Sequence, residues 1–255
     1  MTIMTWVSHI YSKRRARHSW IVGAILFCSP LALGAVPAAT VTGRVELVLS
    51  QDPNVRKHRD FSGVVVWLEP LSPPRSIPIK SIHAEIVQKN KTFTPHVLAI
   101  TTGTTIDFPN YDPIFHNAFS NYDGQIFDIG LYPPGSTRSI TFRREGIVRV
   151  FCNIHPAMSA VIVVLKSPYF SVSDKTGLIE ISEVPPGSYR LHVFHERATE
   201  QTLASLVRTI DLTDHLTLPP LSVSESGYIQ PPHKNKFGKN YPPVTDSGTY
   251  PGQRP

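Results

Sequence analysis

The chain has 255 residues, of which 41% are hydrophobic and 17% charged, enough to build one large or two small cores. Its 24 prolines argue against a helical bundle, since a mid-helix proline costs about 3 kcal/mol, and its two cysteines exclude a disulfide scaffold. The formal net charge is +6, but all four basic residues of the first 34 positions lie in a segment without Asp or Glu. Without that segment 21 basic residues stand against 19 acidic ones, and a net charge of +2 disfavours a nucleic-acid or anionic-membrane partner.

The sequence predicts a secretory signal peptide over residues 1–34. Basic residues at 13–17 precede an apolar run at 20–33, and small residues follow at 34–39. The run is shorter than the roughly 20 apolar residues of a membrane-spanning helix. We therefore expect export to the periplasm, with membrane attachment only if the segment stays uncleaved. Cleavage would remove Cys28 and leave Cys152 as the one cysteine.

From residue 40 onward apolar residues alternate with polar ones, which is typical of strands and not of helices. Turn residues separate the segments at short spacing, as in β-sandwiches. We therefore predict an all-β protein, followed by a Pro/Gly-rich tail at 223–255 that is disordered or loosely docked. The predicted strands are 41–49, 64–68, 84–87, 96–100, 104–108, 139–142, 147–152, 160–165, 178–182, 188–194 and 206–212.

One loop carries a pattern with chemical meaning. Cys152, His155 and Met158 follow one another at intervals of three, where a predicted strand ends. Such a loop can turn a thiolate, an imidazole and a thioether toward one point, and His116 can supply a second imidazole from another loop. Two His, one Cys and a weak axial Met form the ligand set of a blue-copper electron-transfer site. We therefore expect one type 1 copper ion, which would also occupy the otherwise lone thiol.

Residues 82–165 resemble the cupredoxin family, most closely its plastocyanin and amicyanin members. The features in common are Phe93-x-Pro95, Gly103, Asn110-x-Asp112, His116-Asn117, Gly146 and the loop Cys-x2-His-x2-Met with Pro156 directly after the His. The resemblance implies a Greek-key cupredoxin β-sandwich over 82–166. It also implies that Asn117 hydrogen-bonds the cysteine sulfur and ties the ligand loops together. His155 would be the electron port, within an apolar docking patch that includes Pro156 and Ala157.

The flanking strands carry a second resemblance. Residues 174–193, with the turn Pro185-Pro186-Gly187, are similar to the carboxypeptidase regulatory-like β-sandwich, as are residues 41–45 and 63–70. The resemblance implies a small discontinuous sandwich, 40–72 and 167–222, split around the cupredoxin domain. The alternative is that residues 41–70 extend the cupredoxin sheets.

Together these patterns predict a periplasmic protein that carries single electrons between a redox donor and a redox acceptor, each a dehydrogenase or a cytochrome-like protein. We expect no enzyme, because a copper oxidase needs further histidines beside the cysteine. Phe151, Asn153 and Ile154 stand there instead. The alternative function is copper carriage or storage without electron transfer. The count of three Met disfavours it, since carriers usually have open Met or His clusters.

Overall fold

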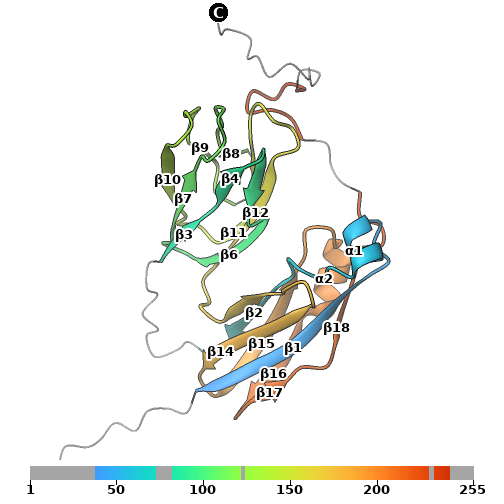
Figure 1. Ribbon diagram of the computed structural model, residues 1–255. Coiled ribbons are helices and arrows are strands. Elements are labelled where there is room, and N and C mark those ends of the chain that lie inside the picture. Colours follow the sequence, from blue (N-terminus) through green and yellow to red (C-terminus); the bar gives the residue numbers. More distant parts are fainter. Residues whose placement is uncertain (1–37, 73–81, 122–123, 230–232, 242–255) are drawn as a thin grey trace, which may run out of the picture. The chain divides into compact units, whose positions relative to one another are not determined.

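The predicted all-β fold is confirmed in the computed structural model (Figure 1). The structure describes residues 38–72, 82–121, 124–229 and 233–241, so the predicted signal peptide lies outside the described residues. Within them the helices are α1 (Pro53–His58) and α2 (Glu200–Leu206), each only about two turns long. No described helix has the length and apolar character needed to cross a membrane.

One β-sandwich, which we call the split sandwich, is built from the two ends of the described chain. Its first sheet consists of β14 (Leu178–Val184), β1 (Ala39–Val48), β17 (Leu216–Thr217) and β18 (Leu221–Ser224). Strand β1 pairs antiparallel with β14 and parallel with β17 and β18. The second sheet has the order β13 (Phe170–Val172), β2 (Val65–Pro70), β15 (Gly187–Phe194) and β16 (Arg208–Leu212).

Alternation along β1 directs its apolar side chains into this sandwich. Val41, Val45 and Leu47 are buried in one cluster with side chains of the opposite sheet, while Arg44 is exposed. Gly177 holds the turn before β14 against β1. Its φ is +81°, and a Cβ there would collide with the carbonyl oxygen of Val45, so the position accepts only glycine without strain.

A second β-sandwich, the inserted sandwich, lies between β2 and β13 in the sequence. One sheet consists of β10 (Thr137–Thr141), β7 (Thr105–Pro109) and β3 (His83–Glu85). The other has the order β6 (Val97–Thr101), β12 (Ser159–Leu165), β11 (Gly146–Phe151), β8 (Phe119–Ser120) and β9 (Phe127–Asp128). The hairpin of β4 (Val87–Lys89) and β5 (Thr92–Thr94) completes it.

Strand β12 is buried on both faces, which explains its unbroken apolar sequence. Ala160, Ile162 and Val164 belong to the core of the inserted sandwich. The alternate residues Val161, Val163 and Leu165 join a separate cluster, which includes side chains of β2 and β15. The two sandwiches are therefore joined by an apolar contact as well as by the chain.

Two of the predicted strand segments differ from the structure. The segment 206–212 begins as helix, because Leu206 is the last residue of α2, and only Arg208–Leu212 is strand. The side chain of Thr199 accepts a hydrogen bond from the Thr202 N–H and caps that helix. The segment 84–87 divides into β3 and β4 instead of forming one strand.

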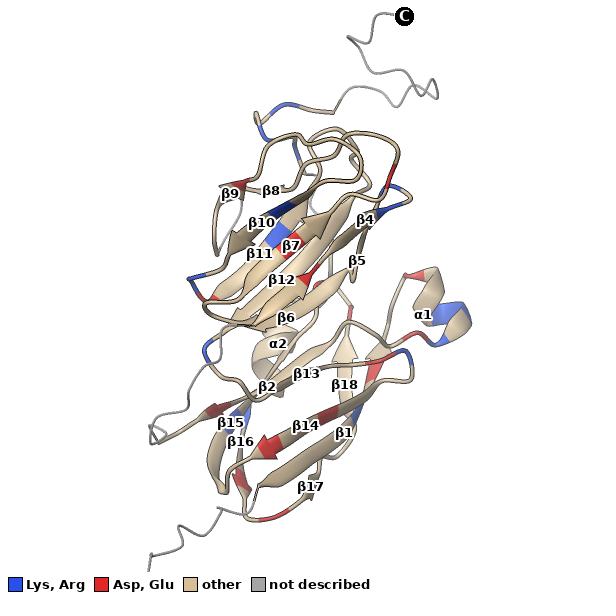
Figure 2. Cartoon of the chain, turned by 60° about the vertical axis from the view of Figure 1, so that its left-hand side comes forward, with Lys and Arg blue, Asp and Glu red and all other residues tan. Residues whose placement is uncertain are grey.

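Charged residues of both signs are spread over the described surface. Figure 2 shows blue (Lys and Arg) on α1, which contains Arg56 and Lys57, and red (Asp and Glu) on β14, which contains Glu180 and Glu183. This distribution agrees with the small net charge calculated for the chain without its first 34 residues.

Candidate metal centre

The centre is built on the ligand loop, residues 152–158, which joins β11 to β12. Val148, Val150 and Cys152 are alternate residues that point into the core of the inserted sandwich, so the thiol is fully buried. The loop is closed by two hydrogen bonds. The Cys152 N–H donates to the Met158 carbonyl at 3.2 Å, and the Met158 N–H donates to the His155 carbonyl at 3.0 Å.

His116 reaches the same end of the sheet from the loop before β8. Phe119 of β8 pairs with Phe151 of β11, so the segments that precede β8 and follow β11 lie side by side. His116 is held by two backbone hydrogen bonds with Tyr132, of 3.2 and 2.9 Å, and its side chain is fully buried. This register brings together residues 36 positions apart in the sequence.

The three predicted N and S donors converge. Nδ1 of His116 lies 3.8 Å and Nδ1 of His155 lies 3.6 Å from Sγ of Cys152, and the three donor atoms lie within 4.8 Å of one another. Consider an ion about 2.0–2.1 Å from each nitrogen and about 2.3 Å from the sulfur. The distance between N and S is then about 3.6 Å if the ligand angles are tetrahedral and about 3.8 Å if they are trigonal. The residues therefore fit one thiolate-binding ion.

Met158 is also brought to this site. It is fully buried in the same cluster as Cys152, and its carbonyl group accepts the Cys152 N–H. The backbone thus places the thioether residue beside the thiol. Its role as a weak axial ligand stays a prediction.

Asp112 orients His116 and was missed as a functional residue by sequence reasoning. Nε2 of His116 donates to Oδ2 of Asp112 at 2.8 Å, which leaves Nδ1 to face the sulfur. The carboxylate also accepts the N–H groups of Asn90 (2.6 Å) and Lys91 (2.8 Å) in the β4–β5 turn. Burial alone would raise the pKa of Asp112, but these three bonds outweigh it and lower the pKa. The sequence feature that could have identified Asp112 is its position four residues before the predicted ligand His116, within Asn110-x-Asp112.

The protonation states suit metal binding. Burial lowers the pKa of His116 despite its bond to Asp112. Burial also lowers the pKa of His155 to about 4, with a smaller effect from the repulsion that a protonated His116 would exert. Burial raises the pKa of the Cys152 thiol, although backbone N–H groups of Asn117, Ile154 and His155 oppose the rise. At neutral pH both imidazoles are therefore neutral, and the thiol gives up its proton when an ion binds.

Asn117 connects the two ligand loops through its side chain. Its Oδ1 accepts the Asn153 N–H at 2.6 Å, and its Nδ2 donates to Asp128 at 3.1 Å. The contact with the cysteine sulfur comes from the Asn117 backbone and not from the side chain. Its effect on the metal stays a prediction.

The ligand loop reaches the surface of the inserted sandwich. His155 and Pro156 are partly exposed and Ala157 is exposed. The assignment of these residues as electron port and docking patch stays a prediction.

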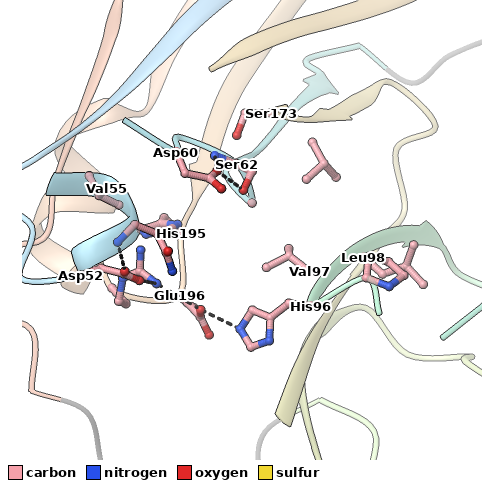
Figure 3. Close-up of a pocket in the computed structure, with 15 residues that line it drawn as sticks. Asp52, Val55, Asp60, Ser62, His96, Val97, Leu98, Ser173, His195 and Glu196 are labelled. Atoms are coloured by element: carbon pink, nitrogen blue, oxygen red, sulfur yellow. Dashed lines mark hydrogen bonds and ion pairs between the residues drawn. The ribbon is translucent and has the colours of Figure 1, made fainter. Parts of the chain in front are cut away.

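A second polar cluster lies elsewhere, around a cavity of about 560 Å³ (Figure 3). His96 contacts Glu196 at 2.8 Å, and Arg197 and His195 both bind Glu225, at 3.0 Å. Within the described part of the chain, His116, Cys152 and His155 are the one group of His, Cys, Asp or Glu side chains close enough to hold an ion. The polar side chains around the cavity form an ion-pair network.

Fold and donors together define a class: a β-sandwich protein with a two-histidine, one-cysteine site, buried except for part of His155, between the loops at one end of its sheets. No family model matches the sequence. Over 60 residues the chain is 38% identical to methylamine utilization protein MauL of Methylorubrum extorquens. The match covers 23% of this chain and 53% of that protein, so the chain spans about half the length of this curated relative.

Three solved structures are similar to parts of the chain. A purple cupredoxin from Nitrosopumilus maritimus is 24% identical, with a TM-score of 0.30 over 32% of this chain and 99% of its own. A copper-containing nitrite reductase from Thermus scotoductus is 23% identical, with a TM-score of 0.33 over 48% of this chain and 28% of its own. A Cu(I) amicyanin variant is 17% identical, with a TM-score of 0.31 over 32% of this chain and 82% of its own. The resemblance of 40–72 and 167–222 to a carboxypeptidase regulatory-like sandwich stays a prediction.

Proposed function

We propose that the protein is an exported, periplasmic type 1 copper protein that carries single electrons between redox partners. The observation that supports this most directly is the approach of two imidazole Nδ1 atoms to 3.6 and 3.8 Å from one fully buried thiol. A thiolate with two imidazoles and a weak thioether is the donor set of blue-copper sites.

In this proposal one copper ion is held by His116, Cys152, His155 and, weakly, Met158. The ion would supply one-electron chemistry between Cu(II) and Cu(I), which both accept this mixed N and S donor set. The chain's own part is to hold the donors ready. Asp112 fixes the His116 ring, the burial of Cys152 excludes water, and the closed loop keeps the donor positions unchanged as charge changes.

Electrons would enter and leave through the exposed part of His155, with Pro156 and Ala157 forming part of the contact surface. A small surface suffices, because transient redox encounters bury less than about 1,200 Å². The donor and the acceptor would be a dehydrogenase or a cytochrome-like protein. The similarity to a methylamine utilization protein supports the proposal that these partners belong to a methylamine-utilization system.

The protein would not be an enzyme. An oxidase or a reductase with a further copper needs additional histidines beside the cysteine ligand, and Phe151, Asn153 and Ile154 occupy those positions. Copper carriage without electron traffic is the competing function, and the test below separates the two.

The test is Cu(II) addition to the purified protein, followed by optical and paramagnetic-resonance spectra and by voltammetry. We expect an intense sulfur-to-copper charge-transfer band and a reversible one-electron wave. Cys152→Ser and His116→Gln should each abolish the band. His83→Gln, which changes an exposed histidine of β3, is the matched control and should keep it. Survival of the band in Cys152→Ser would refute the site, and Cu(I) binding without a reversible wave would favour the carrier.

A further inference from the structure

The C-terminal residues 233–241 lie on the ligand loop, although their composition predicted a disordered or loosely docked tail. Tyr241 donates its hydroxyl hydrogen to the Cys152 carbonyl at 2.9 Å. Nε2 of His233 donates to the Pro156 carbonyl at 2.8 Å. The two carbonyl groups held in this way flank His155, so the segment binds the part of the loop that carries two predicted ligands.

Ring contacts extend this attachment to the strand before the loop. The His233 ring stacks on Phe151, with centroids 4.1 Å apart and planes 20° from parallel. The Tyr241 ring meets the His233 ring edge-on at 5.3 Å. Phe151 alternates with the inward-facing Val150 and Cys152, so these rings cover the outer face of the strand that positions the thiol.

The same segment is attached to the His116 side of the site. The Lys236 N–H donates to Oδ1 of Asn153 at 3.0 Å, and its ammonium group lies 2.8 Å from Asp128. Asp128 in turn accepts the side-chain amide of Asn117, the residue after His116. Both ligand-bearing loops thus share partners with the tail.

The segment has its own fixed conformation. Oδ1 of Asn235 accepts the N–H groups of Phe237 and Lys239, each at 3.0 Å, and the Asn235 N–H donates to the Lys239 carbonyl at 2.9 Å. Gly238 takes a φ of +72°, which this turn requires. A preformed turn loses less conformational entropy on docking than a flexible tail does.

We propose that residues 233–241, which we call the clasp, are a working part of the metal centre. The clasp holds the ligand loop closed over Cys152 and slows both exposure of the thiol and loss of the ion. Tyr241 and His233 are its positioning residues, since they act on the ligands through the Cys152 and Pro156 carbonyl groups. Exposure of a fully buried thiol requires local opening of the loop, and each bond to the loop makes that opening rarer. The inference concerning the ion rests on the proposed function.

The test uses the full chain in a Cys28→Ser background, so that Cys152 is the one thiol. Two variants each remove one hydrogen bond: Tyr241→Phe keeps the phenyl ring, and His233→Phe replaces the imidazole by an aromatic ring that cannot donate. A third variant ends at residue 229. Tyr228→Phe is the matched control, because the clasp contacts with the loop do not involve Tyr228. Two rates are measured: reaction of the metal-free thiol with an aromatic disulfide reagent, and transfer of copper from the loaded protein to a chelator.

We expect both rates to rise about fivefold in each single variant, since an ordinary hydrogen bond changes an equilibrium by about that factor. In the shortened chain both should rise at least about tenfold by the same reasoning, and in Tyr228→Phe neither should change. Urea unfolding, measured in parallel, should show less change than the local rates, which separates the clasp from a general effect on stability. The proposal is overturned if a single-substitution variant and the shortened chain both keep the wild-type rates. If the intact chain shows no charge-transfer band but the thiol rates rise, the clasp stands and the proposed function fails.

Discussion

Replacing Asp112 by Asn tests whether this carboxylate orients the first histidine of the site. Asp112 accepts three hydrogen bonds, from Nε2 of His116 and from the backbone N–H groups of Asn90 and Lys91. Asn retains one acceptor oxygen and replaces the other by an NH2 group. At least one of the three donors must then face another donor, so the His116 ring loses the contact that fixes its tautomer or the β4–β5 turn shifts.

The expected magnitude follows from these contacts. Loss of an outer partner of a ligating histidine weakens metal binding by about 10–100-fold, which corresponds to about 1.4–2.7 kcal/mol. An N–H group left without its buried acceptor costs about 1–3 kcal/mol of the free energy of unfolding of the metal-free protein. We therefore expect Asp112→Asn to lower both copper affinity and apoprotein stability, with the fold still formed.

The assay is competition for copper against a chelator of known affinity, together with urea unfolding of the apoprotein. Asp107→Asn is the matched control. Asp107 is a carboxylate on β7 whose side chain accepts the Ser139 hydroxyl at 2.5 Å and lies near His83, and neither of these residues is a predicted ligand. Equal copper affinities for Asp112→Asn and Asp107→Asn would refute the positioning role, even if Asp112→Asn were less stable.

Two further predictions concern stability. Although burial raises the pKa of Glu225, its hydrogen bonds with His195, Arg197 and Ser50 hold that pKa at about 2. Ionised Glu225 therefore contributes at most about 3 kcal/mol to the free energy of unfolding, a contribution that is complete above about pH 5 and lost as pH falls toward 2. A Glu225→Gln variant whose acid unfolding curve keeps the wild-type slope between these pH values would contradict this. Gly177→Ala should lower the melting temperature well beyond Gly130→Ala, because both sites have a positive φ but only at 177 does the new Cβ collide with a backbone carbonyl; equal losses in calorimetry would contradict the packing argument.

The ligand loop could be predicted from the sequence because its chemistry is local. Cys152, His155 and Met158 are all metal-ligand residue types at spacings of three, which leaves few other interpretations. In the strand before them, the alternation of apolar and polar residues indicates which face points into the core. The position of His116 was harder to predict. It depends on the pairing of Phe119 with Phe151, a long-range register that spacing alone does not determine.

Asp112 and the clasp were missed for a different physical reason. An aspartate near a histidine has no distinguishing pattern until the fold shows that it faces the ring that ligates. Most residues of the clasp are polar, with Phe237 and Tyr241 as its aromatic residues, so composition predicted an unburied tail. Their docking depends on stacking against Phe151 and on backbone carbonyl groups, and neither appears in a hydropathy pattern. Helix α2 was missed because its apolar residues are few and its beginning rests on the Thr199 cap.

The chain order has a consequence for the order of folding. Strand β1 ends at Val48, but its first partner, β14, begins only at Leu178, after the whole inserted sandwich. Strand β1 therefore has no strand neighbour until the chain beyond the inserted sandwich is available, whether the protein folds during synthesis or after export. Until then this strand offers both of its edges to other incompletely folded chains. The split sandwich therefore cannot close before β14 and β18 are available, and the clasp of the metal centre follows later still, so both halves depend on the last part of the chain.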